Sequence, residues 1–150
     1  MSSAKNEKIA KLAQEVVEEA RMVLPGIQAL FGFQLIVIFN ESFRQLTKGE
    51  QLVHFTALIL VALAIAIIMT PAAYHRLAEQ RTVTDFFVRL ASWLIAAAMA
   101  PLMVALSLEV YLLGRIVLDN PWAARTIAAM LLIVFAGLWF AFPLAMRKSD

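Results

Sequence analysis

Four long stretches of this chain carry almost no charge, and they restrict its possible folds more than any other feature. They cover residues 22–39, 52–74, 90–114 and 126–146, and Glu109 is the only charged residue inside them. A helix needs about 20 apolar residues to cross a bilayer core about 30 Å thick. The runs are continuous and rich in Ala and Leu rather than alternating, which excludes the strands of a membrane barrel. The sequence therefore predicts an all-α membrane protein, a four-transmembrane-helix bundle with spans at about residues 25–43, 52–74, 90–113 and 126–146.

The composition agrees with this fold class and excludes several others. Hydrophobic residues make up 62% of the 150 residues and charged residues 16%, whereas soluble domains have about 45–50% and about 25%. The chain has no cysteine, which excludes disulfide bonds, thiolate metal sites and thiol nucleophiles. The net charge of +2 gives no reason to expect a nucleic-acid partner. Because the connections are too short for a soluble catalytic domain, we predict a single membrane domain over residues 1–150.

The basic residues predict how the chain is threaded. Nine of the 13 Lys and Arg residues lie in the N-terminal segment, between the second and third spans, or after the fourth span. Since cytoplasmic loops are enriched in Lys and Arg, both termini are expected in the cytoplasm of a multi-pass protein of a bacterial inner membrane. A cleaved signal peptide is not expected, because the first apolar run begins only at residue 22 and is too long for one.

Residues 3–23 are predicted to form an amphipathic helix before the first span. Apolar residues recur there at steps of three and four: Ile9, Leu12, Val16, Ala20 and Val23. Lys5, Lys8 and Lys11 are expected to contact anionic lipid headgroups. Pro25 lacks an N–H and disfavours helix at Leu24, which predicts a turn into the first span. The helix is then expected to lie on the inner membrane surface as an anchor; a gating or partner-binding role is the alternative.

Catalytic motifs are missing from the sequence. It has no Gly-rich phosphate loop, no His-Glu-x-x-His helix and no Gly-x-Ser-x-Gly elbow. His54 and His75 belong near opposite faces of the membrane, so they cannot share a metal within one subunit. We therefore predict no enzyme activity, no metal site and no cofactor. His75 is a candidate cytoplasmic pH sensor, because histidine titrates near neutral pH; the alternative is a solvated side chain beside Arg76, which is expected to contact lipid headgroups.

Glu109 is the first candidate for an ion pathway. It lies inside the third span near its predicted outer end, where a carboxylate still costs free energy to bury. The functional interpretation is a proton or cation site at an outer vestibule. The alternative is a carboxylate that reaches the interface or pairs with Arg115 or Arg44.

Two glutamines in the first span complete the candidate pathway. Gln28 and Gln34 lie about 120° apart around the helix, so they do not form one polar stripe. If the face that carries Gln28 lines an axial cavity, Gln28 forms a neutral constriction with Glu18 and Arg21 at its inner mouth. The alternative is that each amide bonds to a neighbouring helix.

Small residues recur at four-residue steps in three spans. These rows are Ala62–Ala66–Thr70, Ala96–Ala100 and Gly137–Ala141–Ala145. Small side chains on one face let helix backbones approach closely. They predict that the spans pack against one another, within one subunit or between subunits.

Two segments resemble known sequences. Residues 18–34, with Leu24-Pro25-Gly26 near their centre, and residues 71–76, which end in Tyr74-His75-Arg76, resemble a bacterial family of small four-span membrane proteins of unknown function. The resemblance covers about residues 18–146. It implies four spans and a bacterial inner-membrane location, and some such proteins are labelled sodium/proton antiporter-like. It implies no functional residues.

Two functions remain open on the sequence alone. The first is a homo-oligomeric channel or transporter for a small ion, because one subunit of four helices leaves little interior for a pathway. The second is a non-transporting interaction or regulatory protein that acts on a membrane-protein partner through its N-terminal amphipathic helix. Gln28, Gln34 and Glu109 favour the first, since a passive bundle has no need to bury them.

Overall fold

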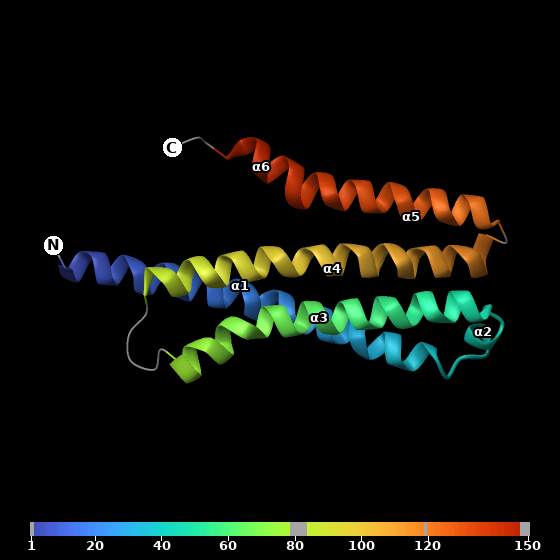
Figure 1. Cartoon of the computed structure of the whole chain (residues 1–150), viewed down its shortest axis with the longest axis horizontal. Helices are drawn as coiled ribbons and strands as arrows, with labels where there is room; N and C mark the ends of the chain where they lie inside the picture. The colour runs from blue at the N-terminus through green and yellow to red at the C-terminus, as the bar shows by residue number, and fades with distance from the viewer. Residues whose placement is uncertain (1, 79–83, 119, 148–150) are drawn as a thin grey trace.

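The computed structural model describes residues 2–78, 84–118 and 120–147, and within these ranges the chain is helical and contains no strand (Figure 1). The elements follow in the order α1 (Ser2–Val37), α2 (Glu41–Arg44), α3 (Lys48–Ala78), α4 (Asp85–Leu118), α5 (Pro121–Ala136), the π-helix η1 (Gly137–Ala141) and α6 (Phe142–Met146). Both ends of the described chain lie at the same end of the molecule, called the terminal end below. The opposite end, where α2 lies, is called the α2 end.

Within the described ranges, four helices are long and apolar enough to cross a membrane, which confirms the predicted fold class. They cover Glu7–Val37, Lys48–Ala78, Asp85–Leu118 and Pro121–Met146. The first helix ends at Val37 rather than near residue 43. Asn40 follows it in an extended conformation and accepts a hydrogen bond from the backbone N–H of Ser42, which starts the short helix α2 instead.

The expected turn at Pro25 is wrong, because α1 is one continuous helix of 36 residues that contains this proline. A proline inside a helix removes one N–H donor and crowds one carbonyl, and packing against neighbouring helices can offset that cost. Here the N-terminal half of α1 packs on the bundle: Ala13 is buried in a cluster with Phe87 and Ala91, and Val16 packs against it. Tertiary packing therefore overrides the local preference of Pro25.

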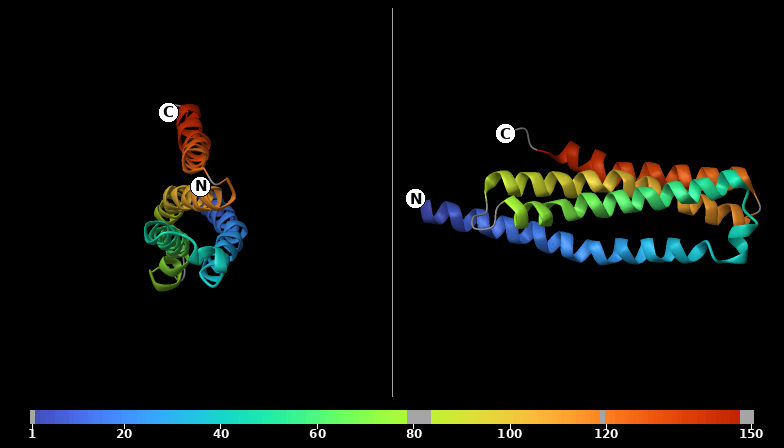
Figure 2. Two further views of the ribbon diagram at one scale, coloured as in Figure 1. Left: turned by 90° about the vertical axis from the view of Figure 1, so that its right-hand side faces the viewer. Right: turned by 60° about the horizontal axis from the view of Figure 1, so that its bottom comes forward.

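The core of the molecule lies between α1, α3 and α4, which surround a common axis (Figure 2). Its buried residues are Ile27 from α1, Ala57, Val61, Ala64 and Ile68 from α3, and Ala98 and Ala105 from α4. The buried positions on α3 alternate by four and three residues, from Glu50 to Pro71. This spacing is typical of the contact face, or seam, between helices that pack in a left-handed bundle. The alanines on this face let the backbones come close.

The predicted rows of small residues do not form this seam. Ala66, Thr70 and Ala96 are exposed on the surface of the chain, whereas Ala57, Ala64 and Ala98 are buried. A strict four-residue step moves around a helix with 3.6 residues per turn, so it leaves the contact face within two turns. The alternation of three and four residues stays on that face.

The fourth helical segment packs differently from the other three. The segment α5–η1–α6 contacts α4 and lies outside the group formed by α1, α3 and α4 (Figure 2). In Figure 1, the end of this segment near α6 diverges from α4. The four predicted spans are therefore arranged as three core helices and one attached helix, most of which is left uncovered by the rest of the chain.

Candidate functional site

Three polar side chains from three different helices meet at the α2 end of the core, and we call them the polar cluster. Gln34 of α1 donates its amide to Oε1 of Glu109 of α4, at 2.8 Å. Nδ1 of His54 of α3 lies 3.1 Å from Oε1 and 3.3 Å from Oε2 of the same carboxyl group. Nε2 of His54 lies 3.0 Å from the backbone oxygen of Gln34. Every member of the cluster therefore contacts the other two.

Burial makes these contacts important for the fold. Gln34 and His54 are each only 3% exposed, and the side chain of Glu109 is 23% exposed. A buried polar group without a partner costs about 1–3 kcal/mol, and more if it is charged. Hydrogen bonds within the cluster provide partners for most of its buried polar atoms. Oε1 of Gln34 is the exception, because this buried oxygen has no hydrogen-bond partner in the part of the chain that the structure describes.

Helix packing explains why these three residues meet. Gln34 lies seven residues after Ile27, which is part of the α1 core stripe, and His54 lies on the buried stripe of α3. The backbone oxygen that faces His54 lies in the last turn of α1, and a carbonyl oxygen has two lone pairs, so it can accept a hydrogen bond from outside the helix. Nε2 of His54 lies at hydrogen-bond distance from this oxygen.

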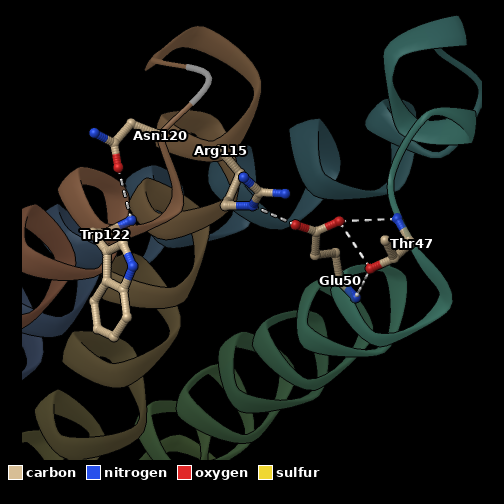
Figure 3. Close-up of polar contacts among 5 residues, drawn as sticks. All are labelled: Thr47, Glu50, Arg115, Asn120 and Trp122. Carbon is tan, nitrogen blue, oxygen red and sulfur yellow. Dashed lines mark hydrogen bonds and ion pairs between the residues drawn. The ribbon is translucent and has the colours of Figure 1, made fainter.

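A second network, drawn in Figure 3, is centred on Glu50, which precedes His54 on α3 and lies closer to the α2 end. Thr47 and Glu50 form a capping box at the start of α3: the N–H of Thr47 donates to Oε2 of Glu50 at 2.9 Å, and the N–H of Glu50 donates to Oγ1 of Thr47 at 3.3 Å. The other carboxyl oxygen of Glu50 accepts a hydrogen bond from Nε of Arg115 at 2.6 Å. Glu50 therefore joins the start of α3 to α4.

The segment between α1 and α3 covers this end of the cluster. The ring of Phe43 meets the ring of His54 edge to face, with centroids 5.2 Å apart. The amide of Gln51 donates to the backbone oxygens of Phe43 and Leu46, which holds the segment against the start of α3. His54 is thus shielded from the α2 end by an aromatic ring.

A cavity of about 650 Å³ lies at the terminal end, between α1, α3 and α4. Most of its lining is apolar, but it brings together four polar residues that the sequence had singled out: Glu18, Arg21, His75 and Arg76. Nδ1 of His75 is buried and has no hydrogen-bond partner in the described residues, while its ring lies 5.4 Å from the ring of Phe87. The apolar core separates this cavity from the polar cluster.

The structure separates the predicted pathway residues into three locations. It brings Gln34 and Glu109 together in the polar cluster and places Glu18 and Arg21 at the cavity. Gln28 is exposed on the outer face of α1, so within one subunit it does not line an axial constriction. Arg115, an expected partner of Glu109, binds Glu50 instead.

The predicted headgroup contacts lie toward the terminal end of the molecule. Lys8, Lys11 and Arg76 are exposed, whereas the side chain of Lys5 lies outside the described residues. Their contact with lipid stays a prediction, as does the pH-sensing role of His75.

Sequence reasoning missed His54 as a functional residue, although a signal for it was present. His54 lies 24 residues before the end of α3 at Ala78, and Glu109 lies 24 residues after the start of α4 at Asp85. In two antiparallel helices, residues at equal distances from their connection lie at the same height. Glu50 on α3 and Arg115 on α4 also lie at similar distances from this connection, so the same reasoning places them at a similar height.

The fold and this site show the class of protein to which the chain belongs. It is a multi-pass helical membrane protein with a polar cluster buried between three of its spans. A family model described as a family of unknown function (DUF6328) matches residues 2–143, so the chain belongs to that family. No curated protein and no solved structure matches the chain.

Proposed function

We propose that this protein translocates a small ion across a bacterial inner membrane as a homo-oligomer, with both termini in the cytoplasm and without catalysing a chemical conversion. One observation carries the proposal: a histidine, a carboxyl group and a glutamine are buried together among apolar helices. Ionisable residues at membrane depth are costly, and they mark ion and proton pathways in helical membrane proteins. Sodium/proton antiport, which the resemblance in sequence implies, is one specific form of this proposal.

Two further features support an assembly of several chains. The cavity at the terminal end and the polar cluster are separated by packed core residues, so one subunit in this conformation holds no continuous polar path. The fourth helical segment leaves most of its apolar surface uncovered by its own chain, and that surface can face lipid or a second copy.

Exposed Lys8 and Lys11 are proposed to hold the terminal end at anionic lipids.

Packing within the chain argues against the alternative function, partner binding through the N-terminal amphipathic helix. Ala13 is 5% exposed, and together with Val16 it packs against α4. Leu12 and Val23 of the predicted stripe are exposed, but Ala13 and Val16 are already used within the chain. A partner would have to displace α1 from the bundle to reach them.

The test is ion flux into lipid vesicles that contain the purified protein, measured separately for H⁺, Na⁺ and K⁺. Glu109→Gln keeps the size of the side chain and removes its charge, so we expect the initial rate for the transported ion to fall at least about tenfold, the effect of about 1.4 kcal/mol on ion binding. Glu41→Gln makes the same chemical change at an exposed position of α2 and is expected to retain the wild-type rate.

Two results would contradict the proposal. One is a wild-type rate no higher than that of protein-free vesicles for all three ions. The other is a Glu109→Gln rate equal to that of Glu41→Gln. Gln28→Leu then locates the pathway: reduced flux assigns it to the outer face of α1 between subunits, and unchanged flux assigns it to the interior of each subunit.

A further inference from the structure

We propose that the polar cluster is a proton-binding site in which His54 and Glu109 hold one proton between them and gain or lose protons as a unit. The inference rests on the proposed function, because it names the proton as the ion that the cluster takes. Its test is an equilibrium measurement that does not depend on transport.

The position of the first proton follows from the contact between His54 and α1. Nε2 of His54 lies 3.0 Å from the backbone oxygen of Gln34. A carbonyl oxygen can only accept a hydrogen bond, so Nε2 must carry a hydrogen. The imidazole is therefore either the Nε2–H tautomer or the doubly protonated cation, and in both states this hydrogen bond is kept.

The second nitrogen decides how many protons the pair holds. Nδ1 of His54 lies 3.1 Å and 3.3 Å from the two carboxyl oxygens of Glu109. Without a hydrogen between them, the lone pair of Nδ1 would face the lone pairs of a carboxylate. One proton removes this repulsion, either on Nδ1 as an imidazolium beside a carboxylate or on the carboxyl group as an acid beside a neutral imidazole. Both arrangements contain the same number of protons and have the same net charge.

Proton exchange then changes the charge of the pair by one at each step. Adding a proton to the one-proton state gives an imidazolium beside a carboxylic acid, and removing one gives a neutral imidazole beside a carboxylate. Because the two groups interact directly, their titrations are coupled and belong to the pair rather than to either residue. The pair can therefore take a proton from one side and release it to another without covalent chemistry.

The side chain of Gln34 positions the carboxyl group of Glu109, and its amide oxygen is free to accept a hydrogen bond from a water molecule. Its amide nitrogen donates to Oε1 of Glu109 at 2.8 Å, which fixes the carboxyl group toward His54. Its amide oxygen is buried and unpartnered in the described part of the chain, although Gln34 is only 3% exposed. An unsatisfied buried acceptor calls for a donor. A water molecule bound there would connect the pair to solvent.

In the described part of the chain, the other charged groups near the cluster are exposed or bind residues outside it. Between Met22 and Val37, α1 contributes no titratable side chain. On α3 and α4, Glu50 and Arg115 bind each other. Among the described residues, the remaining titratable groups near this end are Glu41, Arg44 and Lys48, which are exposed, Tyr111, and Arg125, which lies over the ring of Trp122.

The test follows both groups of the pair in the full-length protein in lipid nanodiscs without an ion gradient. The chain contains two histidines, so ¹⁵N-labelled histidine gives separate signals for His54 and His75, and His75→Gln assigns them. Infrared spectroscopy follows the acid band of Glu109 over the same pH range. We expect Nε2 of His54 to keep its hydrogen throughout, and the Nδ1 signal and the acid band to change at the same pH.

Three variants sharpen the test. Glu109→Gln is expected to abolish the acid band and to change the response of the Nδ1 signal to pH, because the imidazole loses its carboxyl partner. His75→Gln, the matched control at the other end of α3, is expected to leave both His54 signals and the acid band unchanged. Gln34→Met removes the amide while keeping the size of the side chain, and is expected to shift the acid band without moving the signals of His75.

Three results would overturn the inference. They are a bare Nε2 on His54, separate transitions of His54 and the acid band, and a response of the His54 signals to Na⁺ at constant pH, which would assign the cluster to sodium. Coupled titration without any flux would contradict the proposed function alone. Proton flux without coupled titration would contradict this inference alone.

Discussion

Replacing Glu50 with alanine is expected to lower the free energy of unfolding by about 2–3 kcal/mol. The carboxyl group of Glu50 accepts hydrogen bonds from the backbone N–H and the hydroxyl of the N-cap residue Thr47, and another from Arg115. Loss of an N-cap interaction costs about 1 kcal/mol, and a hydrogen bond to a charged group contributes about 1.5–3 kcal/mol. The side chain of Glu50 is 11% exposed and that of Arg115 is 26% exposed, so solvent replaces these contacts only in part.

The measurement is chemical unfolding in detergent micelles, followed by the fluorescence of the three tryptophans. Glu50→Gln keeps an oxygen for the N–H of Thr47 but removes the charge that binds Arg115, so we expect about half of the full loss. Glu41→Ala removes an exposed carboxylate from α2 and is expected to change stability by less than about 0.5 kcal/mol. Equal stability of the Glu50→Ala and Glu41→Ala variants would show that the network in Figure 3 does not hold α3 to α4.

The helices could be predicted from the sequence because the signal for each one is local. A run of apolar residues long enough to cross a bilayer needs no knowledge of its neighbours, and all four predicted spans correspond to helices in the structure. Pro25 shows where local reasoning fails. This residue locally disfavours a continuous helix, but α1 passes through it because residues on both sides, such as Ala13 and Ile27, are buried against the bundle.

The polar cluster could be predicted only in part. The cost of burying polar groups identified Gln34 and Glu109, since that cost depends on the residue and its depth alone. Their mutual contact and the role of His54 depend on which helix faces lie together. Gln34 lies on the stripe that also contains Ala13 and Ile27, at steps of seven residues or multiples of seven. A seven-residue spacing would have placed Gln34, and not Gln28, toward the core.

Arg115 illustrates the same limit for ion pairs. Its charge made it a natural partner for Glu109 on the same helix, but the two residues are six positions apart and lie about 120° from each other around α4. Glu50 reaches Arg115 from the neighbouring helix at the matching height. The choice of partner therefore follows from the register of α3 against α4, which a single sequence shows only when positions are counted from their connection.

Gly114→Ala is expected to destabilise the protein, whereas the same substitution at two other helical glycines is expected to stabilise it. A Cβ atom at Gly114 would lie 3.0 Å from Cβ and 3.2 Å from Cα of Ala124, so α5 would have to move away from α4. Overpacking of this kind costs about 1–3 kcal/mol, against a gain of about 1 kcal/mol in helix propensity. At Gly32 and Gly137 a Cβ meets nothing within 4 Å, so only the gain remains.

The opposite signs make this comparison a test of how the fourth helical segment is attached. Ala124 is fully buried, and it is the only buried residue of α5 in the described chain, so the contact with Gly114 is central to the attachment. Unfolding in detergent measures the three variants against the wild type. Because the chain has no cysteine, spin labels on cysteines introduced at the exposed positions 117 and 127 can also report the separation of α4 and α5. A longer distance in Gly114→Ala alone is expected; stabilisation by all three substitutions would mean that α5 does not rest on Gly114.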